Sequence, residues 1–233
     1  MNNRELINGD CIEIMESMID ENISVDLIVT DPPYGIGYSR HVKDHRFENQ
    51  IQNDATYDLT YEAIQLMGKL IKPTGACYIF GQDTTLPEQY KAIKDAGLRF
   101  KNLLVWEKTN AFGMGDLATS YAKKTEFVVY SHRDDGRHEL KGGRNHNILS
   151  FKALRGRGDN KPLHQNQKPI DLLSFLIEKS SNQNDIVFDP FMGVGSTGAA
   201  CLKTGRDFIG VEIEKSYYDV AKQRLNGEIK ERW

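Results

Sequence analysis

The sequence has few cysteines, no long apolar stretch and little net charge. Its 233 residues include three cysteines, odd in number and without CxxC spacing, namely Cys11, Cys77 and Cys201. We expect small buried thiols there rather than a metal site or a disulfide. No apolar run approaches the roughly 18 residues that a membrane-spanning helix needs, and the N-terminus MNNRELINGD lacks the pattern of a signal peptide. These absences predict a cytoplasmic protein with no metal and no membrane partner.

The remaining composition is that of an ordinary globular domain. Hydrophobic residues make up 39% and charged residues 27% of the chain, which is long enough for one domain, 1–233, with a full core. The formal net charge of −3 is unevenly distributed, because residues 132–168 hold nine Lys/Arg against four acids and carry +5 while the rest carries −8. A segregated basic segment is typical of a nucleic-acid contact, although a solvated loop can have the same composition.

Short apolar runs alternate with helical patterns along the chain. Strands are expected at 5–8, 25–30, 76–80, 100–106, 125–130, 185–189 and 207–213, and helices at 11–19, 61–71, 86–97, 170–180, 196–205 and 216–229. This alternation predicts an α/β domain with a mainly parallel sheet, in which ligands bind beyond the carboxyl ends of the strands. Two stretches, about 35–57 and about 132–163, exceed what simple connections need, and loops of that length are usually functional or disordered.

The stretch TDPPYG, residues 30–35, directly follows the apolar run VDLIV. Two consecutive prolines cannot extend a central strand, because neither donates a backbone hydrogen bond. The strand therefore ends here and a stiff segment begins. A stiff turn accounts for Pro32 and Pro33 but not for Asp31 and Tyr34, which indicates a chemical site.

A second motif, FDPFMGVGSTGAA at 188–200, lies at an expected strand-to-helix junction. Gly193 and Gly195 let the backbone approach a ligand, and Ser196, Thr197 and the first helical amides supply donors. Glu212 ends the next expected strand, where an acid can accept both hydroxyls of a ribose. The pattern indicates a nucleotide-like cofactor.

The type of cofactor depends on two further residues of this motif. Gly198 completes a GxGxxG spacing with the first two glycines, so a nicotinamide or flavin cofactor stays open. Asp189, before the glycines, would repel a pyrophosphate and attract an ammonium group. It therefore favours S-adenosylmethionine, which joins a ribose to a zwitterionic tail and has no phosphate.

Together the two motifs resemble those of the DNA amino-methyltransferases, which act on adenine N6 or cytosine N4. DPPY resembles their catalytic motif and DPFxGxG their cofactor loop, and the order of catalytic motif, basic segment and cofactor loop resembles the β class. The resemblance implies a Rossmann-like S-adenosylmethionine-dependent fold, with a mainly parallel seven-stranded sheet and helices on both faces. LLVWEK (103–108) and TEFVVY (125–130) resemble the family's strands beyond the catalytic one.

Two more segments resemble the family's cofactor site. NGDC (8–11) resembles the segment that contacts the cofactor adenine, and HQNQKP (164–169) resembles the HPTQKP that opens the helix before the cofactor strand. Gln165, Asn166 and Val194 depart from the family's residues. The cofactor-binding residues that the resemblance implies are Asp10, Cys11, Lys168, Asp189, Phe191, Gly193, Gly195, Ser196, Thr197 and Glu212.

The catalytic residues implied are Asp31, Pro32, Pro33 and Tyr34. An exocyclic amino group is a poor nucleophile, because its lone pair is delocalised into the base. Asp31 and the Pro32 carbonyl can accept its two N–H groups and localise that lone pair, while the prolines hold both acceptors rigid. Tyr34 offers a flat face on which the base can stack.

A base inside a duplex reaches such a pocket only by flipping out of the stack. We expect 132–163 to be an inserted target-recognition segment that contacts double-stranded DNA, and 36–57 to be a mobile loop near the target base. The arginines expected to contact phosphates or guanine edges are Arg133, Arg137, Arg144, Arg155 and Arg157. A homodimer and a cognate restriction endonuclease stay open as further partners.

Asp31 favours adenine as the target, because the cytosine-N4 enzymes that the chain resembles usually carry serine there. The alternatives are a cytosine-N4 methyltransferase, a non-catalytic DNA-binding relative that kept the fold, and a nicotinamide-dependent enzyme, which Asp189 disfavours. RNA is the less favoured substrate, since a sizeable basic insertion suits the reading of duplex sequence.

Overall fold

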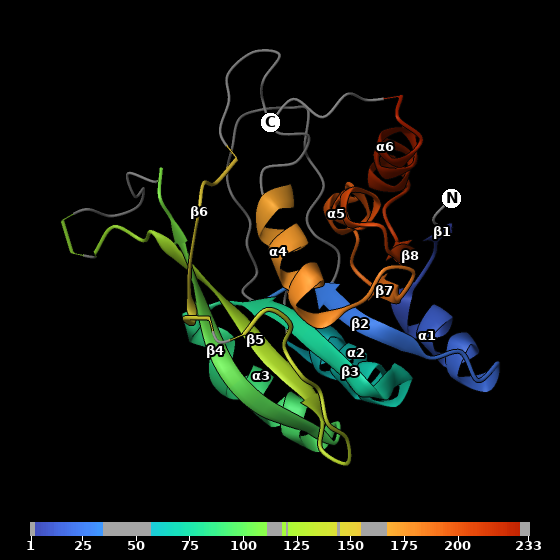
Figure 1. Ribbon diagram of the computed structural model, residues 1–233, viewed down its shortest axis with the longest axis horizontal. Coiled ribbons are helices and arrows are strands. Elements are labelled where there is room, and N and C mark those ends of the chain that lie inside the picture. The colour runs from blue at the N-terminus through green and yellow to red at the C-terminus, as the bar shows by residue number, and fades with distance from the viewer. Residues whose placement is uncertain are drawn as a thin grey trace.

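The structure is a computed structural model that describes residues 3–34, 57–110, 118–119, 121–143, 145–154 and 167–228. It has three layers, with α4, α5 and α6 above a central sheet and α1, α2 and α3 below it (Figure 1). The strands are β1 (Arg4–Asn8), β2 (Val25–Thr30), β3 (Ile71–Gly81), β4 (Leu98–Lys108), β5 (Thr125–Arg133), β6 (Ile148–Phe151), β7 (Ile186–Asp189) and β8 (Asp207–Glu212). The helices are α1 (Cys11–Asp20), α2 (Asp58–Leu70), the short 3-10 helix η1 (Asp83–Thr85), α3 (Leu86–Asp95), α4 (Ile170–Ser180), α5 (Ser196–Thr204) and α6 (Lys215–Leu225).

The sheet confirms the predicted fold class but not the predicted strand number. Its order is β1-β8-β7-β2-β3-β5-β4-β6, which makes eight strands where seven were expected. β5 runs antiparallel to β3 and to β4, and all other neighbours are parallel. The strand that the prediction missed is β6, which lies inside the basic segment and pairs with the last residues of β4. Four residues of which only Leu149 is buried carry too little apolar pattern to be recognised from the sequence.

The central strands are buried on both faces, which explains their continuous apolar runs. In β2, Leu27 and Val29 pack into the core under α4 and α5, whereas Ile28 packs into the core over α1 and α2. The three cysteines lie buried as free thiols, as expected. In the described part of the chain no helix has the length and apolar character needed to cross a membrane.

The topology brings the two sequence motifs together. β2 pairs with β7 in parallel register, so the DPPY segment after β2 and the DPF segment after β7 leave the same edge of the sheet side by side. β8 and β1 lie next along that edge, and Gly9 donates its amide to the carbonyl of Glu212 at 3.1 Å. The carboxyl edge of the sheet is therefore the place to look for a site.

Candidate active site

A cavity of about 520 Å³ opens at this edge of the sheet. Thirteen of the fourteen residues predicted from the sequence to be catalytic or to bind a cofactor line it: Asp10, Cys11, Asp31, Pro32, Pro33, Tyr34, Lys168, Asp189, Phe191, Gly193, Ser196, Thr197 and Glu212. The fourteenth, Gly195, does not line the cavity. It precedes α5 with φ +79, and a Cβ there would meet Ala221 at 3.1 Å, so this glycine shapes the turn.

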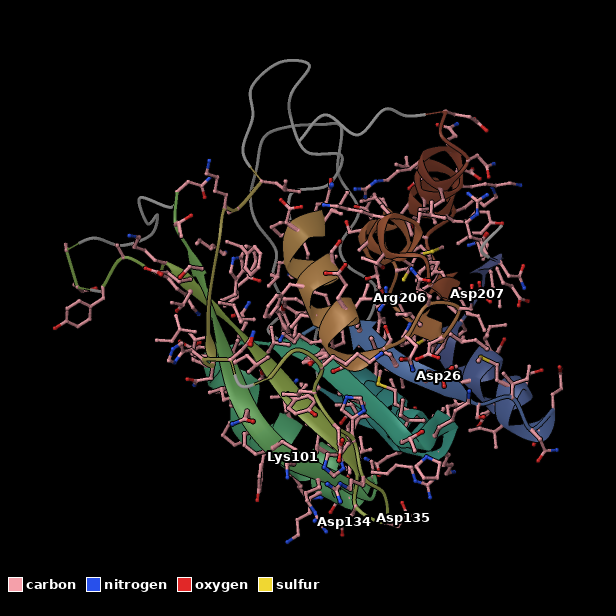
Figure 2. The ribbon with its side chains drawn as sticks, viewed as in Figure 1. Asp26, Lys101, Asp134, Asp135, Arg206 and Asp207 are labelled. Carbon is pink, nitrogen blue, oxygen red and sulfur yellow. The ribbon has the colours of Figure 1, made fainter. Side chains whose placement is uncertain are left out.

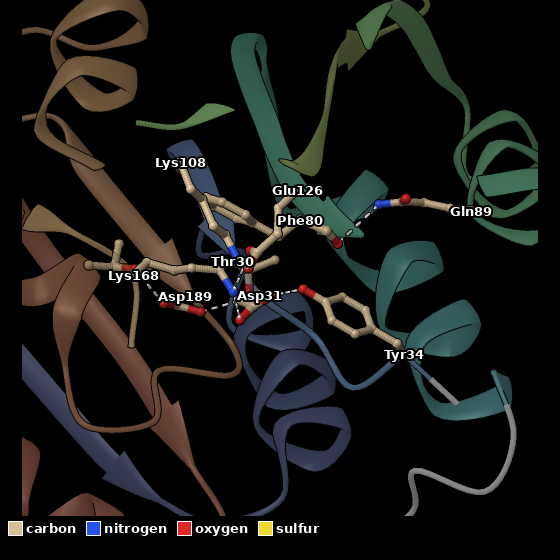
Figure 3. Close-up of polar contacts among 10 residues, drawn as sticks. Thr30, Asp31, Tyr34, Phe80, Gln89, Lys108, Glu126, Lys168 and Asp189 are labelled. Atoms are coloured by element: carbon tan, nitrogen blue, oxygen red, sulfur yellow. Dashed lines mark hydrogen bonds and ion pairs between the residues drawn. The ribbon is translucent and has the colours of Figure 1, made fainter. Parts of the chain in front are cut away.

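Asp31 lines the cavity and lies among Thr30, Tyr34, Lys168 and Asp189 (Figure 3). Its Oδ1 accepts a hydrogen bond from the Tyr34 hydroxyl, and its Oδ2 accepts one from Lys168 Nζ at 2.5 Å. Burial, and then the neighbouring Asp31, hold the pKa of Tyr34 well above its usual range, so this hydroxyl stays a donor. A carboxylate has about four lone-pair sites, and the side chain of Asp31 is 25% exposed. Asp31 can therefore accept further hydrogen bonds from a group in the cavity.

The DPPY segment is held at its far end as well. Thr60, buried in α2, donates a hydrogen bond to the carbonyl of Pro33 at 2.5 Å. The two prolines restrict φ along the segment. Asp31 and the Pro32 carbonyl are thus presented by a backbone fixed at both ends.

Asp189, at the end of β7, is 3% exposed and almost fully hydrogen-bonded. Its Oδ1 accepts from Thr30 Oγ1 at 2.7 Å and from the Phe191 amide at 3.1 Å, and its Oδ2 accepts from Thr197 Oγ1 at 2.6 Å. Burial raises the pKa of Asp189 to about 6 despite these donors. One lone-pair site on Oδ2 is left for a ligand. Thr30, which sequence reasoning missed, joins the catalytic segment directly to the cofactor segment.

Glu212, at the end of β8, is oriented by backbone amides. Oε2 accepts from Gly193 N at 2.9 Å and Oε1 accepts from Glu214 N at 2.8 Å. Gly193 has φ +53, a conformation that favours glycine, and open space where a side chain would lie. Burial raises the pKa of Glu212 above its usual value.

The amino-terminal segment completes this side of the cavity. The Asp10 carboxylate accepts from Ile12 N at 2.8 Å and so caps α1. Cys11 follows it, and burial raises the pKa of its thiol to about 12. A thiol that stays protonated at neutral pH is no nucleophile.

The charged residues that line the cavity differ between its two sides. Toward the ends of β7, β8 and β1 the ionisable lining residues are acids, namely Asp10, Asp189, Glu212 and Glu214, and no described Lys or Arg joins them. Toward β4 and β5 lie Lys108, Lys123 and Lys168, together with Glu126. The acidic half suits a ligand with a ribose and an ammonium group and disfavours a pyrophosphate. It therefore fits S-adenosylmethionine better than a nicotinamide dinucleotide.

Lys168 was predicted to bind the cofactor. In the structure its ammonium contacts the carboxylates of Asp31 at 2.5 Å and Glu126 at 3.2 Å. The neighbours Glu126 and Lys108 were missed, and their ion pair has a distance of 2.5 Å. Glu126 did leave a signal in the sequence, because an acid at an inward-facing position of the strand TEFVVY is unusual.

Two of the five predicted DNA-contacting arginines, Arg133 and Arg137, lie in the part of the chain that the structure describes. Arg133 ends β5 at the edge of the sheet opposite to the cavity, where it pairs with Asp135 at 2.5 Å. Arg137, in the turn that follows, pairs with Glu139 at 2.6 Å. Figure 2 shows Asp134 and Asp135 at this lower end of the sheet. Their placement and ion pairs give no support for a DNA contact of Arg133 or Arg137 at the cavity.

Most of the remaining predictions about DNA concern residues outside the described part of the chain. Arg144, Arg155 and Arg157 lie outside the described residues, and so does the predicted mobile loop 36–57 up to residue 56. The described part of the basic segment leads from the lower edge into β6, whose last residue pairs with Lys108 beside the cavity. The segment thus runs from one edge of the sheet toward the other.

Comparisons with known proteins identify a family and a fold. The model of the DNA methylase family N6_N4_Mtase matches residues 25–223. The chain is 30% identical to the type II methyltransferase M.HpaI of Haemophilus parainfluenzae over 97% of this chain and 75% of the relative. The crystal structure of an M1.HpyAVI–SAM complex superposes with a TM-score of 0.75 at 28% identity, covering 95% of this chain and 100% of that one. PvuII DNA methyltransferase (cytosine-N4-specific) shares the fold, with a TM-score of 0.72 at 16% identity over 97% of this chain and 94% of that one.

Proposed function

Because the chain belongs to the N6/N4 DNA methylase family, whose members transfer a methyl group from S-adenosylmethionine to DNA, we propose that its target is the N6 amino group of adenine in double-stranded DNA. The observation that carries this proposal is Asp31, a carboxylate with free acceptor sites that faces the same cavity as Asp189 and Glu212. Family membership sets aside the nicotinamide-dependent alternative.

Each part of the cavity has a defined task in this reaction. Glu212 would hold the ribose of S-adenosylmethionine and Asp189 its ammonium group, and the bound cofactor would supply a methyl group on a positively charged sulfur. Asp31 and the Pro32 carbonyl accept the two N–H groups of the flipped base and localise the nitrogen lone pair. The nitrogen carries an excess proton after the transfer, and Asp31 is placed to receive it. The fixed DPPY backbone keeps these acceptors in position before the base arrives.

The base assignment is tested by chemistry on the product. Purified protein is incubated with unmethylated genomic DNA and S-adenosylmethionine, and the DNA is digested to nucleosides and analysed by mass spectrometry. We expect N6-methyladenine. Production of N4-methylcytosine alone would contradict the assignment to adenine and leave the family membership intact.

Two substitutions of Tyr34 separate its ring from its hydroxyl. Tyr34→Ala should weaken binding of the target base by about 1–3 kcal/mol, because a stacking surface is lost. Tyr34→Phe keeps that surface and should retain base binding, while the methyl-transfer rate falls because Asp31 loses a donor that orients it. Two quantities are measured. One is the Kd for a duplex in which the target adenine lies opposite an abasic site, and the other is the single-turnover rate. Equal Kd values for the two variants would argue against stacking.

Asp189 should make cofactor affinity depend on pH. Its pKa is raised to about 6 by burial, and only the ionised carboxylate attracts an ammonium group. We therefore expect a constant Kd for S-adenosylmethionine above pH 6 that rises up to about tenfold per pH unit below it, measured by calorimetry between pH 5 and 8. Asp189→Asn is the control, since it should bind more weakly with much less dependence on pH. A Kd in the native protein that does not change between pH 5 and 8 would exclude the ammonium contact.

The division of labour along the chain is part of the same proposal. The chain acts as one domain, 1–233, in which segment 132–163 contacts flanking duplex DNA and loop 36–57 lies over the target base. We assign the DNA contact to the later part of this segment, after the turn between Arg133 and Arg137. A cytoplasmic location agrees with a DNA substrate, and a homodimer and a cognate restriction endonuclease are further partners that such an enzyme can have.

A further inference from the structure

Four neighbouring strands contribute a row of side chains along the carboxyl edge of the sheet. In the strand order β2-β3-β5-β4 the row consists of Asp31, Phe80, Glu126 and Lys108. Phe80 belongs to the core under α4, and side chains alternate along a strand, so the row faces the same side. Lys168, two residues before α4, lies over it (Figure 3). The row therefore combines residues that are far apart in the sequence.

The charges of the row and of Lys168 alternate in sign along their contacts. Lys168 Nζ lies 2.5 Å from Asp31 Oδ2 and 3.2 Å from Glu126 Oε2, and Lys108 Nζ lies 2.5 Å from Glu126 Oε1. The Lys168 ammonium also stands 5.1 Å above the centre of the Phe80 ring. Its side chain is only 8% exposed, against 25% for Asp31 and 24% for Glu126. One buried ammonium is thus shared by two carboxylates.

Asp31 and Glu126 share the Lys168 ammonium unequally. Lys168 donates a hydrogen bond to Asp31, whereas Glu126 Oε2 accepts none of good geometry and acts on the ammonium through its charge. Burial by itself would raise the pKa of Glu126, but Lys168 and Lys108 outweigh burial and lower it. Glu126 is therefore ionised at neutral pH and faces the same ammonium that pairs with Asp31.

We propose that Glu126 is a positioning residue for methyl transfer, which draws part of the Lys168 charge away from Asp31 so that Asp31 remains a strong acceptor for the amino group of the target base. A carboxylate that has an ammonium to itself accepts further hydrogen bonds less well, because its negative charge is cancelled. With Glu126 present, the ammonium fixes the position of Asp31 without cancelling its charge. Glu126 does this without touching the base, and the inference rests on the proposed role of Asp31.

A double-mutant cycle tests this inference. Glu126→Gln keeps the shape of the side chain and removes its charge, and it is made both in the native protein and in a Lys168→Gln background. In the native background we expect the single-turnover rate to fall on the order of tenfold, as is typical of groups that orient a catalytic residue, with the Kd for S-adenosylmethionine within twofold of native. In the Lys168→Gln background the same substitution should not lower the rate, because there is no ammonium left to share.

Two control variants make the outcome decisive. Glu107→Gln should leave the rate unchanged, because Glu107 pairs with Ser150 and does not line the cavity. Asp31→Asn tests the premise, since a fully active Asp31→Asn variant would refute the proposed function itself. A native rate for Glu126→Gln beside an inactive Asp31→Asn would overturn the inference alone. An equal loss from Glu126→Gln in both backgrounds, with circular dichroism showing folded protein, would also overturn it.

Discussion

Replacing Asp31 with alanine is expected to slow methyl transfer by about 10²- to 10³-fold, the usual effect of removing one fixed partner of the reacting group. Binding of S-adenosylmethionine should change little, because Asp189 and Glu212 hold their own hydrogen bonds without Asp31. The rate is measured in a single turnover with a saturating duplex, and the cofactor Kd by calorimetry. Both measurements are needed, since only a rate loss at unchanged affinity identifies a residue that acts on the base.

Asp31→Asn is the matched variant for this prediction. An amide keeps the size of the carboxylate but has a single acceptor oxygen and no negative charge, so its rate should fall nearly as far as that of Asp31→Ala. A rate within threefold of native in either variant would mean that the DPPY segment serves only as a stiff turn. The function would then have to be sought in the non-catalytic alternative.

Replacing Lys168 with methionine is expected to lower the free energy of unfolding by about 3–5 kcal/mol at neutral pH, because it leaves two largely buried carboxylates without their shared cation. Methionine fills a similar volume, so the loss reports charge rather than a cavity. Equilibrium unfolding in urea measures it. The matched control is Lys203→Met, whose exposed pair with Asp171 should contribute about 1 kcal/mol or less.

The loss of stability in Lys168→Met should depend on pH in a defined direction. In the native protein the pKa of Glu126 is lowered, so its contribution is present above the unfolded value and is lost on acidification. Without Lys168 this contribution is smaller, because only Lys108 still pairs with Glu126. The difference between native protein and variant should therefore grow from pH 4 to pH 8. A constant difference over this range would show that Lys168 stabilises the fold by packing alone.

The two motifs could be placed from the sequence because each carries a local physical signal. Two prolines must end a strand, and glycines before a helix must form a close turn, so Asp31 and Gly193 were assigned to strand ends before any strand order was known. The parallel sheet then brings those ends together. Thr30, Glu126 and Lys108 could not be found in the same way, because their roles depend on which strands are neighbours.

Two further features show where sequence patterns stop being informative. The strand β6 was missed because its pairing with β4 comes from tertiary structure and not from its own four residues. Arg133 and Arg137 were grouped with Arg144, Arg155 and Arg157 because charge was counted along the chain. These two flank a turn at the edge of the sheet opposite to the cavity, where Gly136 and His138 lie against Pro73 and Thr74. A count of charge along the chain therefore does not say at which edge of the sheet a residue lies.

The pairing of β1 with β8 has a consequence for the timing of folding during synthesis. Asn8 donates its side-chain amide to the carbonyl of Glu212, a contact across 204 residues, and the strand between β2 and β8 in the sheet is β7, also made late. While a ribosome is still translating residues before β7, β1 has no partner and the cofactor half of the cavity does not exist. Contacts of such long range also slow folding in general. The enzyme can therefore begin to methylate DNA only after β8, which ends at Glu212, has been synthesised and has paired with β1.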